Sequence, residues 1–446
     1  MDAIAQYFKF SERGTNLTTE VRAGVTTFMV MAYIIFVNAS ILGDPNGAGM
    51  DGVAVAAATA LIAGIMTIAM GVVGNYPFAL AAGLGINSIV SYTLAKNAGL
   101  GAAGAMGVII LEGALVTVLV LVGLREAIMD AIPLALKRAI GVGIGLFILF
   151  IGFVNGGLIA TPVAGFPPVS FVFPNSPAAL VTVLGLLVTV GLYALKIRGA
   201  LILSIAIATV IALVLGVASI PKDLLGTYSF ATIGTFDLGS PFTTLGVGLA
   251  ILTIFSIMLI DFFDTMGTVT GVAEQAGLAT PDGKVPGVGR VLIVDSVAAM
   301  VGGFAGTSSN TTNIESAAGV AEGGRTGFTA VVVGVLFLLA IALSPLAGIV
   351  PPSATAPVLI LVGFLMFTLI ADINVRDLED GVPALLTMIL MPLTYDIAIG
   401  IGAGFISWTF IKLVRGKVGE IHPLMWVVSI AFVVFFAQDW IAALLG

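Results

Sequence analysis

The sequence has little charge and no cysteine, and these two absences define its class. Only 9% of the 446 residues are Asp, Glu, Lys or Arg, whereas roughly a quarter are charged in a soluble domain. Without cysteine the chain forms no disulfide and uses no thiolate chemistry. Its single histidine, His422, excludes a metal site built from several histidines. The formal net charge is −7, and the lack of a basic surface predicts no nucleic-acid partner.

The common enzyme motifs are also missing. The sequence has no Gly-x-Ser-x-Gly, no His-Glu-x-x-His and no phosphate-binding Gly-x-x-x-x-Gly-Lys. A membrane protease with two aspartates needs them on facing helices, whereas Asp261 and Asp264 lie three residues apart on one predicted helix. We therefore expect no enzyme and no cofactor. Transport across a membrane, passive or driven by an ion gradient, is the remaining class.

Long apolar segments fill the chain. The sequence is 59% hydrophobic with a mean hydropathy of +1.18, and about 20 apolar residues suffice to cross a bilayer. We therefore expect an all-α, multi-pass membrane protein. Fourteen segments are predicted near 24–42, 53–74, 79–96, 101–124, 132–154, 177–195, 199–217, 245–270, 289–304, 307–322, 327–348, 355–371, 381–395 and 397–414.

The basic residues predict the orientation. With residues 1–23 as a cytoplasmic segment and fourteen crossings, only Lys96 and Lys222 fall outside, as the preference of Lys and Arg for cytoplasmic loops requires. The remaining fifteen then lie inside: Lys9, Arg13, Arg22, Arg125, Lys137, Arg138, Lys196, Arg198, Lys284, Arg290, Arg325, Arg376, Lys412, Arg415 and Lys417. The C-terminal apolar stretch at 424–443 either crosses once more or lies at the membrane surface, and the sequence leaves this open.

The two halves share a weak internal similarity. Ile86-Asn87-Ser88 corresponds to Ile314-Glu315-Ser316, and Ile132-Pro133 corresponds to Val350-Pro351. Each half would hold seven segments, an odd number, so the copies must have opposite orientations. Inverted repeats of this kind are typical of secondary transporters.

Polar residues inside the predicted segments are the candidates for a solute site. Residues 307–316 read Thr-Ser-Ser-Asn-Thr-Thr-Asn-Ile-Glu-Ser, between glycines and apolar segments. Carboxylates at membrane depth are costly and usually functional, which draws attention to Glu315, Asp261 and Asp264. The alternative for each is a structural role, as a helix cap or a hydrogen bond between helices. Glu112, Asp295 and Asp396 are weaker candidates, for which the structural role is favoured, and Asn38 could face either the cavity or a neighbouring helix.

Several motifs resemble those of the adenine/guanine/hypoxanthine permeases of bacteria and fungi. They are Arg13-Gly14-Thr15-Asn16, the stretch from Gly24 to Asn38, Asn75-Tyr76-Pro77, Ala82 to Asn87, Asp261 to Thr268, and Thr307 to Gly319. The resemblance spans nearly the whole chain. It implies fourteen segments in two inverted sets of seven, with a short extended stretch in segments 3 and 10. It also implies a core domain (24–124 and 245–348) and a gate domain (132–217 and 355–414), with 218–244 as an extracellular loop and 415–446 as a C-terminal apolar segment.

The resemblance also implies roles for individual residues. The substrate-binding carboxylates and amide of the family fall on Asp264, Glu315 and Asn87, and the extended stretches place Ile86, Thr312 and Asn313 near the base. Proton coupling would fall on Asp264 or Glu315, with Asp261 as a neighbouring carboxylate. A carboxylate accepts from N–H groups and an amide both donates and accepts, which suits the edge of a purine. The sequence departs from the family near Asp396 and Ile399 in the predicted gate, so substrate range or coupling there could differ.

These observations predict a purine nucleobase:proton symporter in the cell (inner) membrane, importing adenine, guanine or hypoxanthine. The lipid bilayer and protons are its expected partners, and the wider nucleobase transporter group implies a homodimer. The alternative is a carrier of the same fold for uracil, xanthine or a small anion. A channel is disfavoured, because no ring of selectivity groups is apparent. The preferred purine, the affinity and the proton stoichiometry are not predicted.

Overall fold

The computed structural model describes residues 2–123, 132–160, 169–172, 174–220, 228–280 and 285–437, without the side chains of Asp2 and Phe263. Three of the basic residues used to predict orientation (Arg125, Lys222 and Lys284) lie outside these ranges, as do residues 438–443 of the last apolar stretch. The described part is almost entirely helical, with two pairs of very short strands.

Ten helical segments among the described residues are long and apolar enough to cross a membrane, which makes this a multi-pass membrane protein. Two shorter apolar helices, α10 (Ala200–Val214) and α19 (Pro423–Phe436), accompany them. The count of fourteen crossings stays a prediction. The ten are Leu17–Leu42, Gly52–Gly74, Gly101–Leu121, Leu134–Asn155, Pro177–Ala194, Val247–Gln275, Val288–Ala305, Gly327–Gly348, Pro352–Asp372 and Ile397–Val414.

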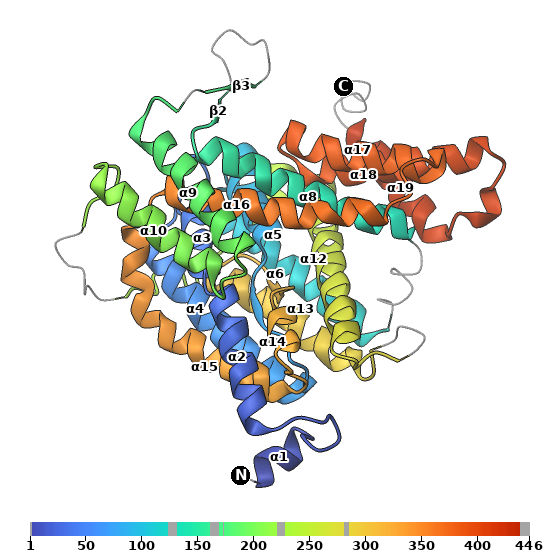
Figure 1. Ribbon diagram of the computed structural model, residues 1–446. Helices are drawn as coiled ribbons and strands as arrows, with labels where there is room; N and C mark the ends of the chain where they lie inside the picture. Colours follow the sequence, from blue (N-terminus) through green and yellow to red (C-terminus); the bar gives the residue numbers. More distant parts are fainter. Residues whose placement is uncertain are drawn as a thin grey trace.

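The helices pack in two groups (Figure 1). In the first group α6 packs along α13, and α15 packs along α4 and α2. Small residues allow this close approach, as expected between helices in lipid. The members of the first group are α2 (Leu17–Met31), α3 (Ile34–Leu42), α4 (Gly52–Ala69), α5 (Leu84–Ser88), α6 (Gly101–Leu121), α12 (Val247–Gln275), α13 (Val288–Ala305), α14 (Ser316–Ala321) and α15 (Gly327–Ala340).

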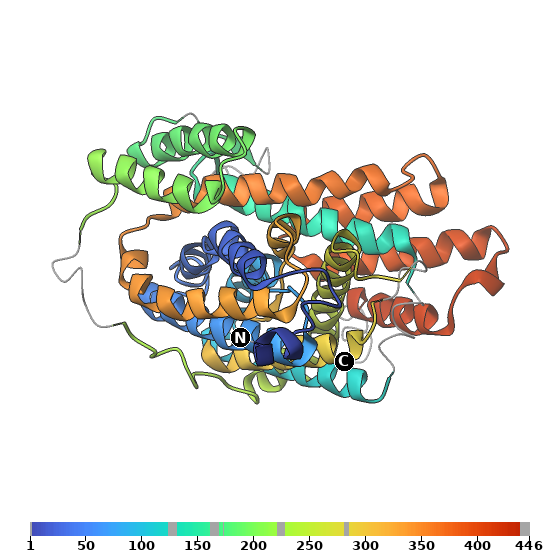
Figure 2. The same cartoon turned by 60° about the horizontal axis from the view of Figure 1, so that its bottom comes forward.

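The second group lies beside the first along one flank, where α8 and α16 run side by side (Figure 2). Around this pair, α9 and α10 pack at one end, and α17 and α18 pack at the other. Contacts between the groups are few and involve mainly α3, α5 and α12 of the first group. The second group consists of α8 (Leu134–Asn155), α9 (Pro177–Ala194), α10, α16 (Pro352–Phe367), α17 (Leu378–Thr394), α18 (Ile397–Val414) and α19.

Two helical segments of the first group are interrupted by extended backbone. Strand β1 (Leu80–Ala82) precedes α5, and strand β4 (Asn310–Thr312) precedes α14. The strands pair antiparallel, with Leu80 opposite Thr312 and Ala82 opposite Asn310. Every residue of both strands is buried. The extended stretches expected in segments 3 and 10 are therefore present, and they contact each other. A second pair, β2 (Ile159–Ala160) and β3 (Ser170–Phe171), lies away from this region.

One buried carboxylate fastens α2 to the start of α15. Glu20 is fully buried and accepts hydrogen bonds from the hydroxyls of Thr326 (2.8 Å) and Thr329 (2.6 Å) and from the backbone N–H of Arg325 (2.9 Å). The N-terminal helix α1 (Asp2–Tyr7) leads into the same region, where the ring of Phe8 lies 5.4 Å from that of Phe328. The predicted N-terminal segment thus packs on the first group.

An ion-pair cluster joins the two groups near the same end. Glu322, which follows α14, accepts from Arg22 of α2 at 3.1 Å and also pairs with Arg198. Arg198 lies in the turn between α9 and α10 of the second group. The pair therefore bridges the seam between the two groups.

A second ionic cluster lies within the second group. The carboxylate of Glu379, in the first turn of α17, is 2.7 Å from Lys412, 2.7 Å from Arg415 and 2.6 Å from Lys417. Hydrogen bonds from Lys412, Lys417 and Arg415 lower the pKa of Glu379 from 4.5 to about 2. The cluster holds the start of α17 against the end of α18.

Gly327→Ala should destabilise the protein, because a Cβ at Gly327 would lie 1.9 Å from the carbonyl oxygen of Gly71. The oxygen belongs to backbone and the Cβ is attached directly to it, so relief requires separating α15 from the π-helical turn Met70–Gly74 that follows α4. Overpacking of this kind costs about 1–3 kcal/mol. We expect the melting temperature of the detergent-purified variant to fall by several degrees. Gly271→Ala, which has open space around it, is the matched control, and equal melting of both variants would contradict the packing argument.

Glu379→Gln should make the thermal stability of the protein less dependent on pH in the acidic range. The pKa of Glu379 is lower in the folded protein, so its ion pairs stabilise the fold above the ordinary value of 4.5 and are lost as the pH falls toward about 2. We expect the wild type to melt above the variant between pH 6 and 8, and the difference to shrink below pH ~4.5. Thermal unfolding followed by circular dichroism across this range measures the effect. A difference that grows on acidification would show that the sign is wrong.

Candidate functional site

The antiparallel pair of strands β1 and β4, their crossing, forms the frame of the candidate site. Helix α13 ends at Gly306, whose φ of +74° is accessible to glycine, and Ser308 follows with φ +68°. Gly302 lies against this turn, since a Cβ there would be 2.2 Å from the carbonyl oxygen of Ser308. The backbone bonds continue beyond the strands: Gly83 N–H donates to Ser309, and Asn313 N–H donates to Ala79. The backbone polar groups of these extended stretches are thus hydrogen-bonded to other backbone groups of the protein.

Asp295 of α13 holds β4 in place. Its Oδ1 accepts from the N–H of Thr312 at 2.9 Å and from the Thr312 hydroxyl at 2.8 Å. Its Oδ2 accepts from the hydroxyl of Thr265 on α12 at 2.7 Å, and Thr265 also lies 2.7 Å from the hydroxyl of Thr311. One buried carboxylate therefore ties α12, α13 and β4 together, which supports the structural interpretation of Asp295.

Glu315 lies just after β4, where α14 begins. Its Oε1 accepts a hydrogen bond of 2.6 Å from the phenol of Tyr33. Tyr33 is 2% exposed and stands between α2 and α3. Asp264 of α12 is only partly buried, and the carboxylates of Asp295 and Glu315 both act on it electrostatically. Asp264 and Glu315 are thus brought into one neighbourhood from segments that are distant in sequence.

Asn87 is fully buried in α5, and neither atom of its amide has a hydrogen-bond partner among the described residues. Leaving a buried amide without partners costs about 1–3 kcal/mol per group. Its helix packs against α3, which follows Tyr33, and against α12, which carries Asp264. A buried amide without a partner among the described residues, on a helix that packs against α12, is a candidate ligand-binding group.

The other predicted site residues are placed as follows. Ile86 is buried in α5, one residue before Asn87. Asn313 is half-buried, and its backbone is bonded to Ala79 and Ser316. Thr312 is buried and its hydroxyl is used by Asp295. Asp261 is 1% exposed and accepts from the Ser309 hydroxyl at 3.2 Å. Asp261 therefore contacts the turn before β4, whereas Asp264 lies near Glu315.

Sequence analysis assigned no role to Tyr33, although its partner Glu315 was a leading candidate. The signal was present: a single phenol in the apolar segment at 24–42 needs a hydrogen-bond partner when buried. The partner itself was not predictable, because Tyr33 and Glu315 are separated by 282 positions.

Two weaker candidates have structural partners. The amide of Asn38 donates to the Thr59 hydroxyl at 2.8 Å and to the carbonyl of Thr307 at 3.2 Å. Asp396 caps the N-terminus of α18, where it accepts from the N–H groups of Ala398 and Ile399. Glu112 is buried in α6. The helix cap made by Asp396 fits the structural role favoured for it, and the partners of Asn38 favour packing against neighbouring segments over a cavity.

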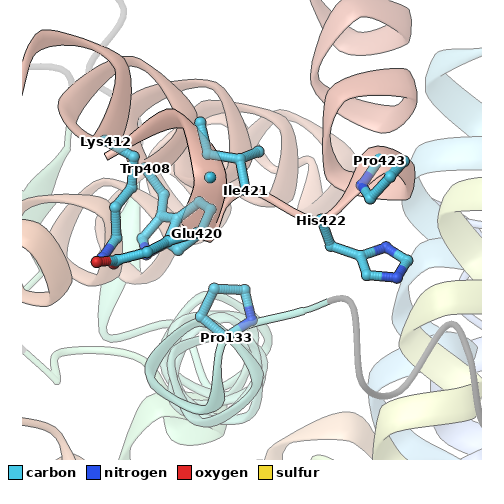
Figure 3. Close-up of a pocket in the computed structure, with 8 residues that line it drawn as sticks. Pro133, Trp408, Lys412, Glu420, Ile421, His422 and Pro423 are labelled. Carbon is cyan, nitrogen blue, oxygen red and sulfur yellow. The ribbon is translucent and has the colours of Figure 1, made fainter. Parts of the chain in front are cut away.

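A hollow of about 480 Å³ lies apart from this site, between the ends of α8, α18 and α19 (Figure 3). Lys412 and Glu420 lie with their charged ends together there, 2.5 Å apart, beside the ring of Trp408. The ammonium of Lys412 is also paired with Glu379. Because this charge is already neutralised from two sides, we assign the hollow no part in the candidate site.

The arrangement at the crossing suits a neutral ligand that donates hydrogen bonds. Two carboxylates accept, an unpaired amide can donate and accept, and Tyr33 orients one of the carboxylates. Among the residues described around the crossing, the charged ones are Asp261, Asp264, Asp295 and Glu315, which are all acidic. Such a site opposes an anion and favours N–H donors.

Comparison with known proteins agrees with this architecture. Residues 18–437 match a family described as "Permease family". The adenine permease AdeP of Escherichia coli is 40% identical over 437 residues, covering 96% of this chain and 95% of that protein. The guanine/hypoxanthine permease PbuG of Bacillus subtilis is 37% identical over 443 residues, covering 96% and 98%.

A solved structure shares the fold at low sequence identity. The transmembrane domain of the cyanobacterial bicarbonate transporter BicA superposes with a TM-score of 0.62 at 15% identity, covering 86% of this chain and 96% of that one. At this identity the likeness shows the fold alone. From the family match and the curated relatives together, the chain belongs to the permease family that includes the adenine and guanine/hypoxanthine permeases, and it is a transporter and not an enzyme.

Proposed function

We propose that the chain imports purine nucleobases (adenine, guanine or hypoxanthine) by proton symport. The observation that carries the proposal is the pair of neighbouring carboxylates, Glu315 and Asp264, together with an unpaired buried amide, Asn87, on a helix that packs against α12. A purine edge presents both N–H donors and ring-nitrogen acceptors, which complement the two carboxylates and the amide. The permease relatives named for adenine and for guanine/hypoxanthine support the same substrate class.

Proton coupling is proposed for Glu315 and Asp264. Two carboxylates that share a poorly solvated site repel each other when both are ionised, so one of them readily takes a proton. Either Asp264 or Glu315, whose Oε1 accepts from the Tyr33 phenol, would carry the proton. A proton bound there would lower the negative charge of the site before the core moves.

Alternating access would use the two packing groups as core and gate. The crossing of β1 and β4 and both carboxylates belong to the first group, and few contacts join it to the second. Antiparallel pairing of the two strands agrees with an inverted repeat, and the proposal includes fourteen crossings in two sets of seven. The proposal includes the inner membrane, a cytoplasmic N-terminus and a homodimer.

Uptake into proteoliposomes tests the function. Radiolabelled adenine, guanine, hypoxanthine, uracil, xanthine and sulfate would be offered with and without an inward proton gradient. We expect accumulation of a purine that depends on the gradient and saturates. Uptake of uracil, xanthine or sulfate in place of these purines would keep the fold and overturn the assigned pocket chemistry.

Glu315→Gln should abolish accumulation of the base against its gradient, because the amide keeps the size of the side chain and cannot take up or release the proton. The measurement is the accumulation ratio in proteoliposomes at matched protein content. Glu274→Gln, at an exposed position of the same helix as Asp264, is the control and should transport normally. Near-normal accumulation by Glu315→Gln would remove its proposed role.

Asp264→Ala should weaken base binding more than Asp261→Ala does. Loss of a hydrogen bond to a charged group costs about 1.5–3 kcal/mol, or roughly 10- to 100-fold in affinity. Asp261 instead bonds to Ser309 beside β4, so its variant should lower thermal stability first. Equilibrium binding and melting of both purified variants separate the two roles. The opposite order of affinities would mean that the aspartates are assigned the wrong way round.

A further inference from the structure

A second pocket lies on the seam between the two packing groups. Its volume is about 440 Å³, within the range of roughly 300–1,000 Å³ found for small-molecule sites. The first group contributes the turn after α3 and the π-helix η2 (Ile89–Asn97). The second group contributes the end of α8 and the turn between α17 and α18. The polar and aromatic lining residues are Asp44, Asn46, Tyr92, Asn97, Asn155 and Tyr395.

A hydrogen-bond chain crosses the seam in this pocket. The amide of Asn155 donates to the phenol oxygen of Tyr92 at 2.9 Å, and the phenol donates to Oδ2 of Asp44 at 2.9 Å. The other oxygen of Asp44 accepts from the N–H of Asn46 at 2.8 Å. Both Asp44 and Tyr92 are at least nine-tenths buried. The carboxylate is thus satisfied by donors and does not call for a cation.

Tyr395 is held in an unusual backbone conformation beside this chain. Its φ is +56°, which is uncommon for a residue other than glycine. The hydroxyl of Thr93 donates to its carbonyl at 2.9 Å, and its ring lies 5.5 Å from that of Phe147 and 6.3 Å from that of Tyr92. A non-glycine residue in this region costs energy and is often found at functional sites. The ring is therefore fixed in place at the pocket wall.

The lining chemistry specifies a flat, neutral ligand with both donors and acceptors. Amides supply both kinds of hydrogen bond, and the half-buried ring of Tyr395 supplies stacking surface, which binds any base by its π-face. The residues that line the pocket in the described structure carry no positive charge, so an anion would not be attracted. A purine or a similar heterocycle meets these requirements.

The pocket is separate from the crossing of β1 and β4. Tyr33 contacts Glu315 at the start of α3, whereas Asp44 follows the other end of that helix. From Tyr33 to Leu42 is roughly 14 Å along the helix axis. Tyr92 follows Asn87 by five positions in the same segment, so the pocket and the candidate site lie in sequence along one seam.

We propose that this pocket is a second, outer binding site for the nucleobase, at which the base is held on its way to Glu315 and Asp264. The proposal rests on the proposed function for the identity of the base. Occupation of the pocket requires the Asn155–Tyr92 contact to rearrange, because that bond joins the two groups across the opening. The outer site should bind more weakly than the inner one, since it lacks an unpaired buried polar group.

Binding to purified full-length Asp264→Ala protein tests the proposal, because that variant has lost one of the two inner carboxylates and should bind the base weakly there. Saturation-transfer NMR with adenine and hypoxanthine detects weak binding, and equilibrium dialysis gives its dissociation constant. We expect a residual binding event that Tyr395→Asn or Asn155→Leu, each added to Asp264→Ala, weakens by ~10-fold or more. Asn is chosen at 395 because it tolerates a positive φ. Tyr228→Asn, at an exposed tyrosine elsewhere, is the control and should leave the event unchanged.

The outcomes separate the two proposals. If wild-type protein transports purines and Asp264→Ala shows no residual binding, or binding that neither outer variant weakens, the outer site is overturned and the proposed function stands. If wild-type protein neither binds nor transports a purine, the proposed function fails and takes the outer site with it. Size-exclusion profiles and melting curves of each variant show whether it is folded. If one of the two outer variants does not fold, the other still tests the outer site.

Discussion

The structure depends on the need to pair backbone polar groups where water is scarce. A helix satisfies its own groups, but at β1 and β4 the chain leaves the helix in the interior of the protein, where each unpaired group would cost several kcal/mol. The two strands satisfy each other, and Asp295 accepts from the N–H of Thr312. The hydroxyls of Thr265 and Thr312 complete the shell of that carboxylate. Without these bonds, Glu315 and Asn87 would have no fixed position relative to each other.

Sequence alone was sufficient for a helical, multi-pass membrane fold, for identifiable reasons, whereas the roles of the candidate site residues stay predictions. Length and hydropathy predicted the apolar helices, whose observed bounds, such as Gly101–Leu121 and Val288–Ala305, lie close to the expected ones. The polar run at 307–316 identified β4, because so many hydroxyls and amides need partners inside an apolar region. The contacts of Tyr33 with Glu315 and of Asp295 with Thr312 were not predictable, since they depend on how distant helices pack. Thr312 illustrates the limit: its place near the site is as expected, and its hydroxyl is used to support the strand.

Buried polar groups in this protein fall into two kinds that differ in their partners. Glu20 and Asp295 accept hydrogen bonds from several nearby protein groups, which makes them rigid joints between helices. Asn87 keeps its amide unpaired in a fully buried position. The contrast matters because hydrogen bonds within the protein already offset the free-energy cost of burying the first kind of group. For Asn87 this cost is offset only when a partner binds to its amide.

Glu322 connects the seam with the segment that carries Glu315. It follows Glu315 by seven positions, across the short helix α14, and it pairs with Arg22 on one side of the seam and with Arg198 on the other. Any rotation of one helix group against the other changes the length of the second pair. Both arginines are well exposed, so dissolved salt screens these pairs readily. A higher ionic strength at this face therefore weakens the ion pairs that hold the two helix groups together, and so makes the groups easier to separate. Glu315 and Asp264 are not part of these ion pairs and are not altered.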